Sequence, residues 1–326
     1  MKGLKFYLRL SQRAKFFVSH LTAFNQKKYF CIKPDVKQFI GISDEEAANC
    51  VIAFGTSGPY QKHTILRFNQ YLNPQSISKI ATTPKASLLL KNEIRILQIL
   101  ATFNTINKQV PIIIEQRGNH KFYAFTQSVG IGNNISPLRD FNKAIPFIRS
   151  LHNESYAEIS LSESQIFNIL NQRYLYLAPL LSSDWKYRYN NCLMRIDQYK
   201  NQKSIFSIAH RDFAPWNMIL QNSNLFVFDW EFAEIQYPPL YDLFHFLLMP
   251  KAVKNKIKQK DIKKVLKIAT DNRINFKPNI AKPTIQLFLY LLDICSFYLY
   301  SNEGFGQEDI IVNQYAALLD NHEKWF

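Results

Sequence analysis

The chain has only four cysteines, and this scarcity limits its chemistry. No two of them show the Cys-x-x-Cys spacing of a zinc or redox site; they stand at Cys31, Cys50, Cys192 and Cys295. Zinc sites and disulfide frameworks depend on recurring, characteristic cysteine spacings. We therefore expect reduced thiols, no zinc site and no disulfide framework, which favours a cytoplasmic protein.

Long apolar runs are also missing. Residues 1–5 lack the sustained apolar core of a secretory signal. The longest apolar run, 285–300, is interrupted by Gln286 and Asp293 and is too short for a membrane span, so we expect a buried helix there. With 326 residues, of which 47% are hydrophobic, the chain can form two lobes with a sizeable core.

Acidic residues are scarce relative to basic ones, with 25 against 40 and a formal charge of +15. Nine basic residues fall in 1–37 and eight lysines in 251–267. The second segment also carries apolar residues at roughly helical spacing, which predicts an amphipathic helix with a basic face. That face is either simply solvated or weakly associated with an anionic membrane surface. Because no recognised binding motif accompanies the charge, we expect no nucleic-acid partner.

The most informative motif is His210-x-Asp212-x4-Asn217, followed twelve residues later by Asp229. Phosphoryl transfer from a nucleotide needs a carboxylate that orients and deprotonates the attacking hydroxyl, together with oxygen ligands for magnesium. We predict that Asp212 is the catalytic base, and that Asn217 and Asp229 bind Mg²⁺ on ATP. The spacing matches the catalytic loop of the kinase superfamily.

The upstream sequence adds a candidate phosphate-binding hairpin. Residues 50–54 and 63–68 are rich in β-branched and aromatic residues and predict two strands. The connection between them contains Gly55, Thr56, Ser57 and Gly58, which we predict to contact the nucleotide. Glycine lets a backbone approach a phosphate closely and turn tightly.

A lysine and a glutamate follow in the order that a nucleotide kinase needs. Strand alternation in 76–81 puts Lys79 on one face with two apolar neighbours, although Lys85 is a competing candidate. Residues 86–100 show helical periodicity and contain Glu93. We predict that Glu93 pairs with Lys79 and keeps its ammonium group directed at the phosphates.

Two further strands are predicted at 110–115 and 121–126, before a segment of small residues at 127–133. We expect a hinge in this segment, with backbone groups near Gln127 and Val129 meeting the adenine. The predicted domains are a basic N-terminal extension, a nucleotide-binding N-lobe, and a C-lobe with the catalytic loop and acceptor pocket. Their ranges are 1–45, 46–130 and 131–326.

These motifs, in this order, resemble the aminoglycoside phosphotransferase and choline-kinase-like family of small-molecule kinases. The resemblance covers about 50–325 and is most specific at 210–242. It implies an α+β, protein-kinase-like fold of two lobes, with a five-stranded antiparallel sheet and one main helix in the first and mostly helices in the second. It also implies that Asp242 accepts backbone hydrogen bonds from the catalytic loop; a carboxylate at a helix N-terminus is the alternative. Arg211 replaces the commoner glycine, and we expect a structural role for it.

The acceptor is expected to be small. Asp229 lies only thirteen positions before Asp242, and neither Phe-Gly after Asp229 nor a later Ala-Pro-Glu is present, so a peptide platform lacks room. We expect the acceptor pocket in 153–206 and in the helices after 250. Its most suggestive cluster is Asp184, Trp185, Tyr187, Arg188 and Tyr189.

The resemblance favours ATP- and Mg²⁺-dependent transfer to a hydroxyl of a small polar metabolite such as a sugar or glycan precursor. A pseudokinase-type binding module is the alternative, and the oligomeric state is left open. Among the other residues near the motif, Glu231 and Glu234 are interpreted as exposed loop glutamates. Trp216 and Trp230 are interpreted as packing residues that keep water from the site.

Overall fold

The structure is a computed structural model that describes residues 49–55, 58–119, 122–137, 139–271 and 281–325. The predicted extension at 1–45 lies outside the described residues, as do Thr56 and Ser57. The chain forms two compact units. The first contains the described residues up to 135 together with 216–232, and the second contains the described residues of 136–215 and those from 233 onwards. The sequence-based division at residue 130 did not anticipate that 216–232 belongs with the first unit.

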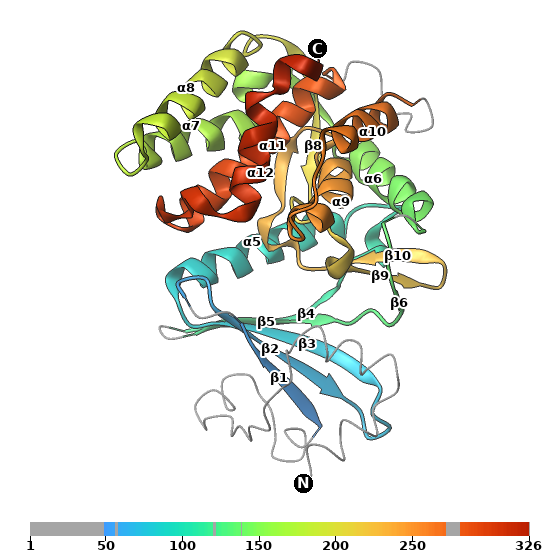
Figure 1. Ribbon diagram of the computed structural model, residues 1–326. Helices are drawn as coiled ribbons and strands as arrows, with labels where there is room; N and C mark the ends of the chain where they lie inside the picture. Colours follow the sequence, from blue (N-terminus) through green and yellow to red (C-terminus); the bar gives the residue numbers. More distant parts are fainter. Residues whose placement is uncertain (1–48, 56–57, 120–121, 138, 272–280, 326) are drawn as a thin grey trace. The chain divides into compact units, whose positions relative to one another are not determined.

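An antiparallel sheet is the main element of the first unit, with strand order β1-β2-β3-β5-β4 (Figure 1). This confirms the predicted five-stranded sheet. The predicted starts of the first three strands lie within two residues of the observed ones, whereas β4 begins three residues later than predicted. Pro111 has no N–H to donate to a strand ladder, which is consistent with that later start. The bounds are β1 (Cys50–Phe54), β2 (Lys62–Phe68), β3 (Pro74–Ala81), β4 (Ile113–Gly118) and β5 (Tyr123–Ser128).

One main helix, α5 (Pro84–Leu100), packs on this sheet. The Thr83 hydroxyl caps it by accepting the N–H of Ala86 at 3.2 Å, and Pro84 occupies the first turn, where a missing N–H costs nothing. The buried stripe consists mainly of aliphatic residues, but it also contains Glu93. A carboxylate on the apolar face of a helix needs partners, and these define the candidate site below.

The first unit also contains a β-hairpin from the later part of the chain, β9 (Met218–Gln221) and β10 (Asn224–Val227), with the short β6 (Asn133–Asn134) paired to β9. The two turn residues of the hairpin, Asn222 and Ser223, both have positive φ, as a tight two-residue turn requires. A Cβ atom at Gly130 would lie 2.4 Å from the Phe226 ring. Gly130 thus permits close packing of the chain on the hairpin. This packing role could not be recognised from the sequence, where Gly130 is only one of several small residues in its segment.

The second unit is mostly helical in its described part, as predicted. A small sheet of order β11-β8-β7 lies among the helices, and β8 leads directly into the His210–Asp212 loop. The strands are β7 (Ala157–Ser160), β8 (Lys203–Ala209) and β11 (Glu234–Tyr237). The helices are α6 (Phe141–Ser155), α7 (Gln165–Leu177), α8 (Ser183–Asp197), α9 (Tyr241–Ala252), α10 (Gln259–Thr270), α11 (Pro283–Ser301) and α12 (Ile310–Asp320). Short 3-10 turns lie at Asn107–Gln109, Leu161–Glu163, Pro215–Asn217, Trp230–Phe232, Phe305–Glu308 and His322–Trp325.

Helix α11 is the predicted apolar helix. By length and composition it is the one described helix that could cross a membrane, but 67% of its apolar window is buried inside the protein. It packs against α7 and α12, as a core helix does. Its buried polar residues, Gln286 and Asp293, face partners within the second unit.

The second basic segment departs from its prediction as a single amphipathic helix. Its first residues end α9, and α10 begins only at Gln259. Ile262, Val265 and Ala269 are the buried apolar residues of α10. Most of the lysines are exposed, namely Lys254, Lys256, Lys258, Lys260, Lys263, Lys264 and Lys267; Lys251 pairs with the Asp261 carboxylate.

The contact between Gly130 and Phe226 predicts a stability effect. Because the added methyl group of Gly130→Ala would overlap the buried ring, the substitution should lower the free energy of unfolding by about 1–3 kcal/mol. Urea denaturation measures this loss. Replacing the ring by a smaller side chain in a Gly130→Ala/Phe226→Leu double variant should recover part of the lost stability. If the stability losses of the two single variants are strictly additive in the double variant, the contact is contradicted.

Candidate functional site

The centre of the candidate site in the first unit is the buried side chain of Lys79 on β3. Its Nζ lies 2.6 Å from Glu93 Oε1 and 2.7 Å from Oε2 on α5. Glu93 is fully buried. The structure therefore brings together the lysine and the glutamate that the sequence placed on a strand and a helix, whereas Lys85 lies over the Tyr60 ring.

Lys79 also contacts the residue predicted to bind metal. Its Nζ lies 2.6 Å from Asp229 Oδ1, so one ammonium group joins two carboxylates that are 136 positions apart in the chain. Burial disfavours the ammonium form, but Asp229 and Glu93 outweigh burial and raise the pKa of Lys79. Asp229 has a φ of 69°, a left-handed conformation that aspartate tolerates better than most residues.

The segment after Asp229 is fastened to α5. Glu93 Oε1 accepts the N–H of Trp230 at 3.3 Å, and the Asn92 amide donates to the Glu231 carbonyl at 2.9 Å. Trp230 is fully buried, with its Nε1 donating to the Val227 carbonyl. Trp216, by contrast, is 37% exposed, so the predicted packing role is wrong for this residue.

Glu231 corrects a second prediction. It is buried, not exposed, and its carboxylate pairs with Lys62 Nζ, which also lies 3.9 Å from Asp229 Oδ1. The strand register explains why Lys62 and Lys79 reach the same carboxylates. Thr64 lies opposite Lys79, and Lys62 is two residues before Thr64, so both lysines project from the same face of the sheet. Lys62 was not predicted as a site residue, although its place at the end of the glycine hairpin was a usable signal.

The oxygen donors near Lys79 suit a hard divalent cation. Glu93, Asp229 and Glu231 each offer a carboxylate oxygen, and these atoms all lie within 4.8 Å of one another. The β9–β10 hairpin also brings the backbone of Asn217, the second predicted metal ligand, next to that of Asp229. The Asn217 carbonyl accepts the N–H of Phe228, the residue before Asp229, at 3.0 Å. Carboxylate and amide oxygens are the protein ligands that Mg²⁺ prefers, so the donor set fits this ion.

The glycine hairpin lies at the end of the same strands. The Gly55 N–H donates to the Lys62 carbonyl at 2.8 Å, and a Cβ atom at Gly55 would lie 2.4 Å from that oxygen, so only glycine fits. Gly58 lies in the turn, where its carbonyl accepts the N–H of Gln61.

The residues predicted to meet the adenine lie on and just after β5. Gln127 is buried, and its Oε1 has no hydrogen-bond partner among the described residues. A buried amide oxygen without a donor is costly, and a ligand N–H could satisfy it. Val129 packs against an apolar cluster of Leu66, Phe68 and Ile77, which is a suitable surface for a flat heterocycle.

In the second unit, Asp242 holds the loop that carries Asp212. Its carboxylate accepts the N–H groups of His210 at 2.8 Å and Arg211 at 3.0 Å. This is the bonding that the family resemblance implied, and it occurs in the first turn of α9. Burial raises the pKa of Asp242 in spite of these bonds. Asp212 itself has 30% of its side chain exposed, and its Oδ1 lies 3.1 Å from His245 Nε2.

Arg211 has the structural role expected for it. Its guanidinium lies 2.9 Å from Asp293 Oδ2 on α11 and 4.8 Å from the centre of the Tyr237 ring. Asp293, fully buried, also accepts from Arg173 at 2.8 Å and from the Tyr241 hydroxyl at 2.5 Å. Burial opposes the charge of Asp293, but the two guanidinium groups prevail and lower the pKa of this carboxyl group.

The cluster suggested for the acceptor does not converge on a site. Trp185 and Tyr189 are buried in the second unit, and the Tyr189 hydroxyl donates to the Leu170 carbonyl. Arg188 pairs with Asp320, while Tyr187 is 72% exposed. These contacts favour packing over binding.

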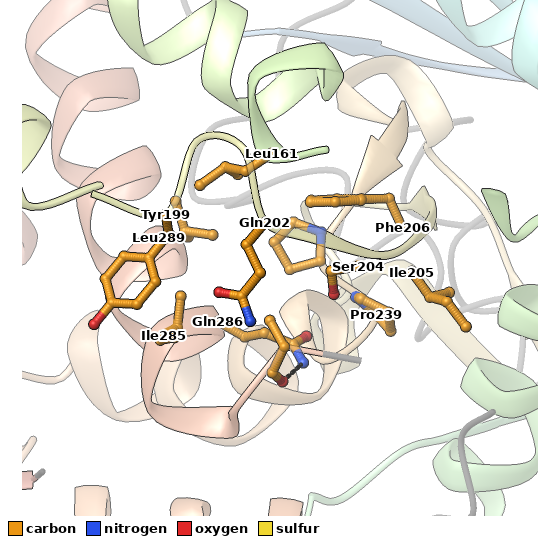
Figure 2. Close-up of a pocket in the computed structure, with 12 residues that line it drawn as sticks. Leu161, Tyr199, Gln202, Ser204, Ile205, Phe206, Pro239, Ile285, Gln286 and Leu289 are labelled. Carbon is orange, nitrogen blue, oxygen red and sulfur yellow. Dashed lines mark hydrogen bonds between the residues drawn. The ribbon is translucent and has the colours of Figure 1, made fainter. Parts of the chain in front are cut away.

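A pocket between β8, the Pro238–Pro239 segment and the start of α11 is no better as an acceptor site (Figure 2). Its volume is about 20 Å³, which is room for one water molecule. Figure 2 also shows Gln286 among the lining residues, and its amide is already bonded to the Leu240 N–H and the Ala281 carbonyl.

Comparisons with known proteins show the family and the fold of this chain. Residues 63–256 match the profile of a phosphotransferase enzyme family. A putative fructosamine-3-kinase from Haemophilus somnus is similar in structure with a TM-score of 0.51 and 12% identity, over 88% of this chain and 94% of that chain. An aminoglycoside phosphotransferase from Streptomyces rimosus gives a TM-score of 0.49 and 12% identity, over 81% and 98%. No curated protein matches the sequence. The first of these likenesses confirms the predicted kinase-like α+β fold.

The Asp293 network predicts a pH-dependent stability. Asp293→Asn removes the carboxylate that two buried guanidinium groups share and should cost about 3–5 kcal/mol at neutral pH. Because the folded-state pKa of Asp293 is lowered, its contribution is complete above the unfolded value of about 4 and is lost as the pH falls below it. Denaturant titrations from pH 7 to 3 should show that the difference in free energy of unfolding between wild type and variant becomes smaller. A difference that does not change with pH would contradict this role of Asp293.

Proposed function

The chain belongs to the phosphotransferase enzyme family, and from this premise we propose that it transfers the γ-phosphoryl group of ATP to a hydroxyl group of a small polar metabolite, with Mg²⁺ as the metal. The observation that carries this proposal is the contact of Lys79 with both Glu93 and Asp229. In kinases, a strand lysine paired with a helix glutamate binds the phosphates, and a carboxylate beside them binds the metal.

The proposed step begins at Asp212. A lone pair of the acceptor oxygen attacks the γ-phosphorus while the hydroxyl proton passes to the Asp212 carboxylate. The bond between the γ-phosphorus and the β,γ-bridging oxygen breaks, and ADP leaves with that electron pair. Lys79 would stabilise the phosphates, with Glu93 keeping its ammonium in place. Positioning and electrostatics therefore supply most of the rate enhancement.

Asn217 and Asp229 are the proposed magnesium ligands, and Glu231 is a third oxygen donor in reach of the same position. When bound, the ion neutralises charge on the phosphates. Gly55, Gly58, Gln127 and Val129 are the described residues proposed to line the rest of the nucleotide site, together with Thr56 and Ser57 from the same hairpin.

A sugar or glycan precursor is the proposed class of acceptor, and the resemblance to small-molecule kinases is its support. A cytoplasmic setting is proposed as well, since the buried Cys192 and Cys295 are free thiols. Burial raises the pKa of Cys192 to about 12, so it is an inert thiol and not a reactive one.

Label transfer tests the proposal. The protein is incubated with γ-labelled ATP, magnesium and a small-molecule extract, and soluble products are separated. Label in a product that forms with wild type but not with Asp212→Asn supports the proposal and supplies the acceptor for identification. Label only in protein, or no labelled product at any acceptor concentration, would count against a small-molecule kinase.

Asp212→Asn should lower kcat by about 10²–10⁴-fold, because the amide cannot accept the proton. Its dissociation constant for ADP, measured by calorimetry, should stay within about twofold of wild type. A variant that keeps near-normal kcat would exclude Asp212 as the base.

Asp229→Asn should weaken magnesium-dependent nucleotide binding by at least about tenfold, because a charged oxygen ligand is lost. Binding is measured with and without Mg²⁺, and the difference should nearly vanish in the variant. Glu115→Gln is a matched control, since Glu115 forms an exposed pair with Arg117 in the same unit. Equal magnesium dependence in Asp229→Asn and wild type would rule out the metal assignment.

A further inference from the structure

One face of α9 contacts three consecutive residues of the catalytic loop. Asp242, in the first turn, accepts the N–H groups of His210 and Arg211. His245, three residues later and therefore on the same face of the helix, has its Nε2 3.1 Å from Asp212 Oδ1. The backbone of the loop and the side chain of its aspartate are thus held by one helix.

His245 is an unusual residue for its surroundings. It is 2% exposed, lies in an otherwise apolar stretch with Phe244 and Phe246, and packs edge-on against the Tyr290 ring. A buried polar ring is costly unless it is hydrogen-bonded. The Asp212 carboxylate provides that bond, which gives the histidine a reason to be there.

The contact also indicates which nitrogen carries the proton. An ionised carboxylate only accepts hydrogen bonds, so Nε2 must donate. Nδ1 is buried and has no hydrogen-bond partner within the described part of the chain. A proton on Nδ1 would bury an N–H without an acceptor, whereas a proton on Nε2 has the Asp212 carboxylate as its acceptor.

We propose that His245 is a positioning residue for Asp212: its Nε2–H holds Oδ1, so that Oδ2 is directed to the acceptor hydroxyl. This proposal rests on the proposed function, in which Asp212 is the base. The carboxylate is partly exposed, and a hydrogen bond to one of its oxygens limits its rotation. Small errors in the placement of a catalytic group cost about 10²-fold in rate, so a fixed oxygen has a large effect.

The experiment compares His245→Phe with His245→Gln in the full-length protein. Phenylalanine fills the space of the ring without a donor, whereas glutamine can present an amide N–H near the position of Nε2. The measured activity is magnesium-dependent ATP turnover with water as the acceptor, recorded as kcat and KM for ATP. Tyr290→Phe is a matched control, since it removes only the hydrogen bond between Tyr290 and Tyr315 in the core behind His245; thermal unfolding confirms that each variant is folded.

His245→Phe should lower kcat by about 10–100-fold with KM for ATP within about twofold of wild type, and His245→Gln should recover most of the rate. Because His245 acts through Asp212, adding His245→Phe to Asp212→Asn should cause no further loss. Tyr290→Phe should keep the wild-type kcat.

Equal kcat in His245→Phe and wild type would overturn the positioning role and leave the proposed function intact. A loss of the same size in His245→Phe, His245→Gln and Tyr290→Phe would also overturn it, because core packing would then be the cause. Wild type that binds ATP but transfers label neither to water nor to any small-molecule product would overturn both proposals, and the wild-type measurements alone distinguish this outcome from the others.

Discussion

The buried ammonium group of Lys79 is the interaction on which the first unit depends. It joins a strand, a helix and the segment after the β9–β10 hairpin through two short ion pairs. Removing Lys79 would take the ammonium partner from the fully buried Glu93 carboxylate, which is far costlier than losing a surface pair. The same electrostatic need that stabilises the unit also gathers the carboxylates at one place. The proposed binding site for cations and phosphates would therefore be a by-product of a stable core.

In the second unit, buried carboxylates hold a loop in place, namely the predicted catalytic loop that contains His210 and Arg211. Asp242 accepts the backbone N–H groups of His210 and Arg211, and Asp293 neutralises the guanidinium group of Arg211. Arg211 has a φ of 66°, a strained conformation for a long side chain, and these bonds maintain it. Kinases with a long activation segment order such elements through phosphorylation. Here the counter-charge is an aspartate of the core, so the loop is held without a modification.

The order of motifs along the chain predicted much of this arrangement. The sheet, α5 and the pairing of Lys79 with Glu93 follow from strand alternation, helical periodicity and the known needs of phosphate binding. Other contacts have no local signal. Asp293 appeared in the sequence only as a charge that interrupts an apolar run, yet its partners lie 82 and 120 residues away. Glu231 and His245 were missed for the same reason, because burial and ion pairs between distant segments depend on the folded chain.

The return of residues 216–232 to the first unit has a consequence for synthesis of the protein. Lys79 and Glu93 leave the ribosome well before their later partners. Trp230 follows Glu93 by 137 positions, and Asp229 follows Lys79 by 150. The emerging N-terminal half therefore lacks the hairpin that packs on Gly130 and the carboxylate that completes the lysine site. Domains usually fold in order as they emerge. In this chain the first unit can be completed only after residues 136–215 of the second unit have been translated.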